Sequence, residues 1–512
     1  MSALVRATTA LACIASLALP GLALAQARRP YLQRGTPTSM HVVWRSAAAE
    51  PTRVCWGTSA SSLGSSAGSG ASEIDHDVTI EGLSPSTQYF YRAAAASCSA
   101  ATTGDANDTF TTSPPRGSTA PFRMWIVGDS GTGDAAQAGV RDAMLAYVGA
   151  DFPDLVLHMG DIAYTAGTTA QFDSGFFGPY ADILRRVPCW PTMGNHEGIS
   201  AHSSTETGPY YEAYSLPRDG SAGGVASGTE AYYSFDYANV HFVVLNSQDV
   251  SRSPTGAMLT WLESDLSANV SDWTIAYFHH PAYTHGTHNS DTESQLVEMR
   301  ENALPILEAH GVDAVLAGHS HAYERSYLVH GAYDTPTTAA GHVVDPGDGQ
   351  LDGDGAYHSG PEGALYVVAG HGGASTGGSL DHPLMFFSES MHGSCIVDVD
   401  GDTLTLTNVR TDGTVTDHVS LTHAGTPPPP RDGGFVEPDA STFRPDAGPR
   451  PDAATPLDGA VAGDDAATTA PPPASGGCGC AAAGTASSRG VLALLLGLVL
   501  AARVRQRARR QR

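Results

Sequence analysis

Five short apolar runs, each ending in a polar loop, constrain the fold of this chain more than any other feature of its sequence. They are FRMWIVGD, DLVLHMGD, VPCWPTMGN, WTIAYFHH and VDAVLAGH. Helical periodicity lies between several of them, at 135–148, 256–266 and 293–310. Strands that alternate with helices favour an α/β fold with functional residues in the loops at strand ends. Two hairpin-like segments, YYSFDYANVHFVVLN and CIVDVDGDTLTLTNV, indicate that the sheets are mixed.

The polar residues behind these runs form a mixed set of oxygen and nitrogen donors. Glycine precedes four of the polar groups, which lets the backbone turn tightly and the side chains converge. Two carboxylates, an amide, three imidazoles and a phenol suit two metal ions that share a bridging carboxylate, because a single zinc needs only three or four ligands. The seven candidate ligands are Asp129, Asp161, Tyr164, Asn195, His279, His319 and His321.

Each of these residues taken alone has a structural explanation. An aspartate after glycine at a strand end is commonly a turn or helix-cap residue. A tyrosine beside a strand end is commonly a buried core residue. All five groups in this order, each closing an apolar run, favour a metal centre over these separate explanations.

The order D, GDxxY, GNHE, H, GHxH resembles that of the calcineurin-like metallophosphoesterases. The tyrosine of GDxxY and the tail GHSHAYER narrow the resemblance to the purple acid phosphatases, over about residues 28–423. The resemblance implies a layered α/β/β/α domain with two mixed sheets, preceded by a small fibronectin type III-like β-sandwich. It also implies two metal ions, Fe(III) and a divalent ion (zinc, manganese or iron).

The same resemblance divides the candidate ligands between the two ions, with Asp161 bridging. The residues similar to the family's ferric ligands are Asp129, Asp161, Tyr164 and His321. Those similar to its ligands of the divalent ion are Asp161, Asn195, His279 and His319. A tyrosine hydroxyl loses its proton only above pH 10 in water, so a phenolate ligand at acidic pH favours a hard, strongly polarising ion such as Fe(III).

The implied activity is that of an acid phosphatase, which hydrolyses phosphate monoesters by attack of metal-bound hydroxide. His196 matches the family's substrate-facing histidine and is the candidate proton donor. His280 and His288 are further candidates for substrate binding, although His288 is separated from His285 by Gly-Thr where the family often has adjacent histidines. The alternatives are a phosphodiesterase or nucleotide pyrophosphatase with the same metals, and a catalytically inactive surface adhesion module.

Three residues near the motifs have no settled role in the sequence. Arg325, in AYERS, either pairs with a carboxylate or faces the substrate. Glu197 orients a neighbour or caps a helix, and we assign it no chemical role. His371, in VVAGHGGAS, is a loop histidine or lines the rim of the site. The segment 198–228 is expected to be a long loop that overhangs the site and selects substrates.

Ahead of the catalytic domain we expect two further units. Residues 1–27 read as a signal peptide, with Arg6, an apolar stretch and small residues before the cleavage site. Residues 28–112 contain strand-like runs and LSPSTQYFYR, which resembles the tyrosine corner of fibronectin type III-like sandwiches. A linker follows at 113–120 and the catalytic domain at 121–424. Export permits disulfides, so Cys55 and Cys98 could pair, whereas buried free thiols are expected at Cys189 and Cys395.

The C-terminal part predicts attachment to a surface. Residues 425–477 are rich in Pro, Ala and Asp and indicate a disordered stalk. Residues 478–512 hold GCGC, a twelve-residue apolar run and an Arg-rich end, and the run is short of the ~20 residues that a spanning helix needs. The arrangement resembles bacterial C-terminal sorting signals; a permanent membrane anchor is the alternative. We expect an exported protein, associated with the cell surface or outer membrane or released.

The net charge of −26 excludes a general nucleic-acid binder.

Overall fold

The structure, a computed structural model, describes residues 27–99 and 105–423 of the chain. The expected signal peptide, the stalk at 425–477 and the segment 478–512 lie outside these described residues, apart from residue 27 itself. Within the described ranges, no helix is long and apolar enough to cross a membrane.

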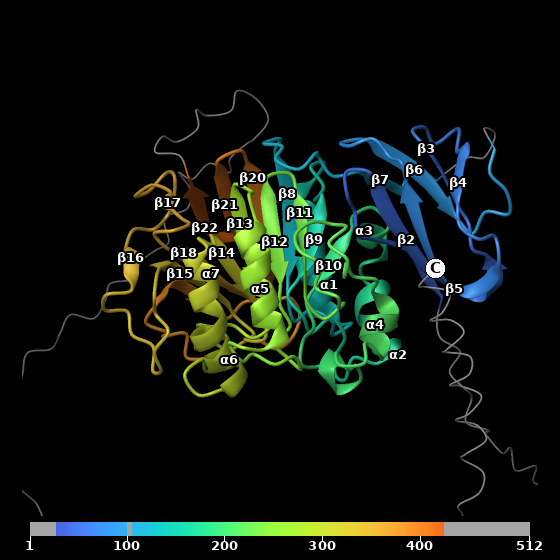
Figure 1. Ribbon diagram of the computed structural model, residues 1–512. Coiled ribbons are helices and arrows are strands. Elements are labelled where there is room, and N and C mark those ends of the chain that lie inside the picture. Colours follow the sequence, from blue (N-terminus) through green and yellow to red (C-terminus); the bar gives the residue numbers. More distant parts are fainter. Residues whose placement is uncertain (1–26, 100–104, 424–512) are drawn as a thin grey trace, which may run out of the picture. The chain divides into compact units, whose positions relative to one another are not determined.

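The first unit is an antiparallel β domain, drawn in blue in Figure 1. Its two sheets pack around a core that includes Trp44, Ile80, Tyr91 and Phe110. The strands of the two sheets, in spatial order, are β1 (Arg28–Gln33), β2 (Ser39–Pro51) and β5 (Ser72–Glu81), then β4 (Ser65–Ala67), β3 (Val54–Gly57), β6 (Gln88–Ala93) and β7 (Thr109–Thr111).

A disulfide and a tyrosine contact brace this domain. Cys55 and Cys98 form a disulfide, as the sequence allowed. The Tyr89 hydroxyl accepts a hydrogen bond from the Ser84 amide at 3.0 Å, a local contact of the kind that a tyrosine corner makes. The relation to fibronectin type III domains stays a prediction. In the second domain, Cys189 and Cys395 are buried free thiols, which confirms that expectation.

The second unit is built on two mixed sheets that stack face to face, which confirms the α/β/β/α prediction. The seven-stranded sheet runs β10 (Cys189–Pro191), β9 (Leu155–His158), β8 (Phe122–Val127), β20 (Gly393–Asp400), β21 (Thr403–Arg410), β22 (Val415–Thr422) and β17 (Tyr357–His358). The eight-stranded sheet runs β11 (Tyr233–Tyr237), β12 (Val240–Val244), β13 (Trp273–Tyr277), β14 (Ala314–Ala317), β18 (Ala364–Ala369), β15 (Tyr323–Val329) and β16 (Val343–Asp345), with β19 (Met385–Glu389) paired to β15.

One hydrophobic core lies between the two sheets and another beneath the helices of the eight-stranded sheet. Trp190 of one sheet stacks on Phe235 of the other, with ring centroids 3.9 Å apart. Helix α1 (Ala135–Val148) packs on β20 and β21. Helices α5 (Ala257–Ala268), α6 (Ser294–Glu298) and α7 (Leu304–Ala309) lie over the eight-stranded sheet (Figure 1). The short helices are α2 (Thr169–Phe172), α3 (Ala181–Leu184) and α4 (Pro209–Ala213).

The helix expected over 293–310 is divided into two. A π-helical turn, Met299–Ala303, separates α6 from α7. Pro305 in the first turn of α7 cannot donate a backbone hydrogen bond, so a continuous helix would lack that bond and clash with its ring. Arg300 in the π turn is fully buried, and its guanidinium donates to the carbonyls of Ala282 and Ser290.

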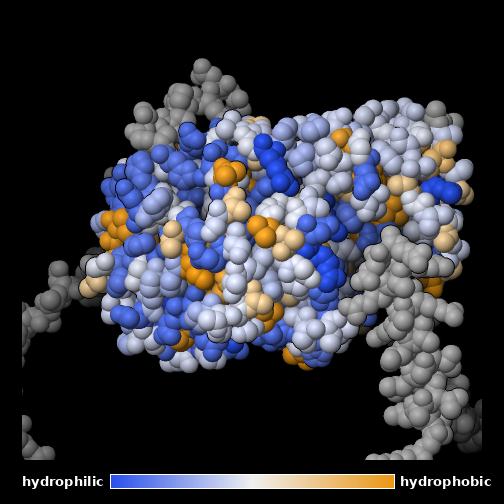
Figure 2. Space-filling model, viewed as in Figure 1, coloured by the Kyte–Doolittle hydropathy of each residue, from blue (hydrophilic) through white to orange (hydrophobic). Residues whose placement is uncertain are grey.

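The surface carries no broad apolar patch on the face drawn in Figure 2, where hydrophobic residues appear as scattered spots. The large apolar side chains exposed in the described part of the chain are also dispersed along it. They are Ile74, Ile199, Val270, Val344, Leu351 and Met391.

A buried histidine should make the fold more stable in acid than in alkali. His241 of β12 lies between two carboxylates, 2.7 Å from Asp236 and 2.9 Å from Asp265. Although burial opposes the charge, hydrogen bonds to both carboxylates raise the pKa of His241 from 6.5 to about 9. The folded protein thus holds this proton more tightly than the unfolded chain. The contribution, up to about 3 kcal/mol, is complete below pH 6.5 and declines as the pH rises through 9.

Thermal unfolding of His241→Asn at pH 6 and pH 9.5 tests this. The loss in Tm relative to the wild type should be large at pH 6 and much smaller at pH 9.5. The exposed His358→Asn serves as the control, for which we expect little change at either pH. Equal losses for His241→Asn at both values would refute a charged, paired His241.

Candidate metal centre

All seven candidate ligands lie together where strands of the two sheets end. Strands β8, β9 and β10 run parallel in one sheet, and β12, β13 and β14 run parallel in the other. The carboxyl ends of parallel strands meet at one edge of a sheet, so their following loops converge. The loops after β8, β9, β10, β13 and β14 carry Asp129, Asp161, Tyr164, Asn195, His279, His319 and His321.

The first group of donors surrounds the Tyr164 hydroxyl and is rich in oxygen. This hydroxyl lies 3.1 Å from Asp161 Oδ2, 3.2 Å from Asp129 Oδ1 and 3.3 Å from His321 Nε2. His321 Nε2 is also 3.6 Å from Asp129 Oδ1. Four donor atoms, three of them oxygens, therefore face a common point.

The second group of donors surrounds the Asn195 amide oxygen and is richer in nitrogen. Asn195 Oδ1 lies 2.9 Å from both His279 Nε2 and His319 Nδ1. These two ring nitrogens are 3.2 Å apart. Asp161 joins this group through its other oxygen, Oδ1, which is 3.5 Å from His279 Nε2. Asp161 thus offers one oxygen to each group, which is the arrangement expected of a bridging ligand.

The spacing of these donors fits metal ions. Atoms bound about 2.0–2.2 Å from one cation lie roughly 2.8–3.6 Å from each other in tetrahedral or octahedral arrangements. The donor pairs above are 2.9–3.6 Å apart. Three clusters able to hold a metal occur in the described residues: Asp129 with Asp161 and His321, His279 with His280 and His319, and His288 with Glu293 and His319.

The backbone is strained at three of the candidate ligands. Asp129, Asp161 and His319 have φ of 55°, 52° and 65°, in the left-handed region that non-glycine residues rarely adopt. Such conformations cost about 1–3 kcal/mol each and cluster at functional sites. The glycines that precede Asn195 and His319 have no side chain, so their backbone can lie close to other candidate ligands. A Cβ at Gly194 would lie 2.2 Å from Asp161 Oδ1, and one at Gly318 would lie 2.5 Å from Asp129 Oδ2.

Without a cation, the site is electrostatically unfavourable for a phenolate. Burial, followed by the charges of Asp129 and Asp161, raises the pKa of Tyr164 well above 10. Burial, followed by the neighbouring His319 and His279, lowers the pKa of His280 well below 6.5. A hard positive ion between the carboxylates and the phenol would relieve the first of these costs.

Glu197, for which we predicted no chemical role, holds two ligand loops in place. It is fully buried. Its Oε1 accepts hydrogen bonds from the amides of Ile162 and Ala163, both at 2.9 Å, and its Oε2 accepts from the Gly194 amide at 3.0 Å. Burial and the charge of Asp161 raise the pKa of Glu197. The residue therefore orients its neighbours, one of the two roles left open by the sequence.

The three candidate substrate histidines differ in exposure. His196 is partly exposed; its Nδ1 donates to the Thr165 carbonyl at 2.6 Å, and its Nε2 lies 3.7 Å from Asp161 Oδ2. His288 is also partly exposed and stacks on His319, with ring centroids 3.8 Å apart. His280 is 2% exposed and its Nδ1 bonds Ser247 Oγ at 2.8 Å, so little of its ring remains for a substrate.

Glu293 is a residue of this site that the motifs did not reveal. Its Oε2 lies 2.9 Å from His288 Nδ1 and 3.7 Å from His319 Nε2. A carboxylate behind a metal-binding histidine fixes the ring and its tautomer. The only sequence signal was an acidic residue five positions after His288, at the start of α6.

Other residues discussed from sequence have partners outside the seven donors. His371 lies in the loop after β18, as one of the two expectations had it, and is fully buried, with Nε2 2.9 Å from Asn408 Oδ1. His285 pairs with Asp381 at 2.9 Å. The segment 198–228 is not one irregular loop, since it contains helix α4; its Ser200 hydroxyl donates to the Gly167 carbonyl at 2.7 Å.

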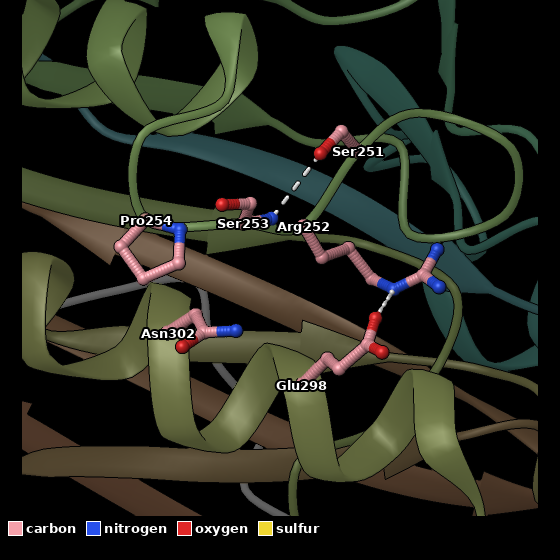
Figure 3. A pocket seen from close by; sticks show the side chains of 6 residues that line it. All are labelled: Ser251, Arg252, Ser253, Pro254, Glu298 and Asn302. Carbon is pink, nitrogen blue, oxygen red and sulfur yellow. Dashed lines mark hydrogen bonds and ion pairs between the residues drawn. The ribbon is translucent and has the colours of Figure 1, made fainter.

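A pocket of about 440 Å³ lies between the segment 251–254 and the helical residues Glu298 and Asn302. Figure 3 shows its lining residues, Ser251, Arg252, Ser253, Pro254, Glu298 and Asn302. The Arg252 guanidinium donates to Glu298 at 2.7 Å and to the Ser247 carbonyl at 2.8 Å. Because the Ser247 hydroxyl contacts His280, Arg252 braces the loop behind the second donor group.

Comparison with known proteins finds two matching domain families and several similar proteins. Residues 122–323 match the calcineurin-like phosphoesterase family, and residues 27–112 match the purple acid phosphatase N-terminal domain. Purple acid phosphatase 23 of Arabidopsis thaliana is 32% identical, over 50% of this chain and 58% of that protein. Purple acid phosphatase 15 of the same plant is 29% identical, over 61% of this chain and 56% of that protein. The chain thus spans just over half the length of these relatives.

Among solved structures, a purple acid phosphatase from yellow lupin (Lupinus luteus) seeds shares the fold. It is 20% identical with a TM-score of 0.58, covering 77% of this chain and 74% of that one. PhoD has a TM-score of 0.52 at 14% identity. Two domain models match in this order and the relatives are of one kind, so the chain is similar to purple acid phosphatases, with a match to the calcineurin-like phosphoesterase domain behind a match to their N-terminal domain.

Proposed function

We propose that this protein is a binuclear-metal acid phosphatase that hydrolyses small phosphate monoesters. One observation carries the proposal: Asp161 offers Oδ2 to one group of donors and Oδ1 to a second group. A carboxylate shared in this way would hold two cations side by side, and such a pair would supply the clamp on a phosphoryl group that in-line displacement needs. The purple acid phosphatase relatives support the same reaction.

The donor chemistry supports different ions in the two groups. Asp129, Asp161, Tyr164 and His321 present mostly hard oxygen donors, which suit Fe(III), whereas Asp161, Asn195, His279 and His319 present a mixed set that suits divalent zinc, manganese or iron. When bound, the two cations supply Lewis-acid activation of the phosphate and of a water molecule.

The chain's own residues complete the reaction. His196 donates its Nδ1–H to the Thr165 carbonyl, which orients the ring, and in the imidazolium form its Nε2–H would give a proton to the departing oxygen of the ester. His288 donates its Nδ1–H to Glu293, and in the imidazolium form its Nε2–H would donate to a phosphate oxygen. His280, buried behind His319, supports the second donor group instead of meeting the substrate.

We also propose export and attachment to the cell surface through residues 425–512. The disulfide between Cys55 and Cys98 supports an oxidising compartment. The apolar and Arg-rich end, which resembles a sorting signal, and the stalk lie outside the described residues, so this proposal rests on their sequence.

Metal analysis, visible spectroscopy and ester hydrolysis of the purified protein test the assignment together. We expect one iron and one divalent ion per chain, a phenolate-to-iron band that Tyr164→Phe abolishes, and faster hydrolysis of p-nitrophenyl phosphate than of its bis ester at acidic pH. Removal of the metals with a chelator should abolish activity.

The possible results separate the parts of the proposal. A colourless, active protein with two zinc ions would overturn the ferric assignment but leave the hydrolase. Preference for the bis ester would favour a phosphodiesterase. A protein that binds both metals yet hydrolyses neither ester would favour the inactive surface module.

A further inference from the structure

Glu324, in the AYER tail of the last motif, is a buried carboxylate whose hydrogen bonds go to the segment 284–285 and to none of the seven donors. It lies three residues after His321 on β15 and is fully buried. Its Oε2 accepts a hydrogen bond from the Thr284 hydroxyl, and its Oε1 accepts from the His285 amide at 3.2 Å. Burying a carboxylate is costly unless its oxygens are bonded, so both oxygens are committed to the segment 284–285.

Thr284 makes further contacts at the base of the tight loop 284–290. Its Oγ1 lies 2.7 Å from Ser320 Oγ and accepts from the Gly286 amide at 3.0 Å. Its backbone bonds Ser290 through both its amide and its carbonyl. The loop 284–290 is therefore closed at its base, and Glu324 accepts two of the hydrogen bonds made there.

The loop is packed against the last motif without spare room. A Cβ at Gly286 would lie 2.2 Å from Ser320 Oγ, between the two candidate ligands of that motif. A Cβ at Gly378 would lie 2.2 Å from the Gly286 carbonyl carbon. The His321 amide donates to Thr287 Oγ1 at 2.9 Å. Backbone shifts at Thr284 would thus be passed directly to His321 and to the loop tip.

The tip of this loop carries His288, whose ring covers His319. We propose that Glu324 is a positioning residue that fixes the loop 284–290 on the metal centre and so sets where His288 meets the substrate phosphate. This inference rests on the proposed phosphatase function and adds to it a group that touches neither metal nor substrate.

Glu324→Gln tests the idea with nearly unchanged volume. The amide can accept at only one atom, so either Thr284 or the His285 amide loses its acceptor. We expect wild-type metal content, a 10-fold to 100-fold loss of affinity for inorganic phosphate measured by calorimetry, and a matching rise in KM that exceeds the change in kcat. In the metal-free protein, hydrogen exchange at the His285 and Gly286 amides should accelerate. Thr284→Val should reproduce these effects and Thr284→Ser should not.

Two comparisons separate positioning from general destabilisation. Glu308 is another buried carboxylate, bonded to Gly331, Tyr333 and Tyr366, and Glu308→Gln should lower stability without changing phosphate affinity. In a His288→Ala background, Glu324→Gln should have little additional effect on phosphate affinity. Unchanged affinity and exchange in Glu324→Gln of an active enzyme would overturn the inference alone. A wild-type protein without phosphatase activity would instead overturn the function on which it rests.

Discussion

Asp161→Asn is expected to reduce kcat/KM for a phosphate monoester by at least about 1,000-fold and to lower the content of both metals. The side chain serves both donor groups, through Oδ2 at 3.1 Å from the Tyr164 hydroxyl and Oδ1 at 3.5 Å from His279 Nε2. Asparagine keeps the size but replaces one oxygen with an NH₂ group, which cannot bind a cation. One of the two groups therefore loses a ligand and the shared negative charge is removed from both. Steady-state kinetics and metal analysis on the same preparation measure the effect.

The control is Asp142→Asn, a change of the same kind on the exposed face of α1, where Asp142 pairs with Arg141. It should keep wild-type activity and metal content. Retention of both metals and of activity within tenfold in Asp161→Asn would rule out the bridging role. Loss of one metal with most activity retained would reduce the catalytic requirement to a single ion.

The donor set could be predicted from the sequence because each candidate ligand is marked by the residues next to it in the chain. Each candidate ligand follows an apolar run, and a run of that length becomes a buried strand in either sheet. Once strands are parallel, their ends meet at one edge, so the convergence of Asp129, Asn195 and His319 needs no knowledge of the connections between them. Helix α1 has the bounds that periodicity alone indicated, 135–148, because Asp134 caps its start and Gly149 ends it.

The supporting carboxylates could not be predicted in the same way. Glu197, Glu293 and Glu324 each bond groups that are distant in sequence or lie across a turn, so no periodic pattern marks them. The burial of His280 is likewise set by Ser247, which comes from a different strand end. These roles depend on how the two sheets are stacked. The sequence predicts the class of fold but not which side chains the stacking brings into contact.

Arg325 was open between two roles, and its contacts are those of a structural residue. It is fully buried and donates to both oxygens of Asp417, at 2.9 Å and 2.7 Å. Its Nη1 donates to the Asp348 carbonyl, and its guanidinium lies 4.2 Å from the centre of the Phe386 ring. The Tyr323 hydroxyl also donates to Asp417, at 2.7 Å. All of these guanidinium contacts are made inside the protein, where the Arg325 side chain is fully buried.

Arg325→Leu should therefore lower the free energy of unfolding by about 3–5 kcal/mol, since it leaves Asp417 charged and unpaired in the interior. The activity of the folded fraction at 25 °C should stay within roughly threefold of wild type, because no contact to the donors is removed. Arg325→Leu combined with Asp417→Leu should recover at least about half of the lost stability, since the unpaired charge is then gone. Arg141→Leu, which breaks a surface pair, should cost less than about 1 kcal/mol. Denaturant unfolding and kinetics on the four proteins decide the matter: a stable Arg325→Leu with strongly raised KM would mean that this arginine faces the substrate after all.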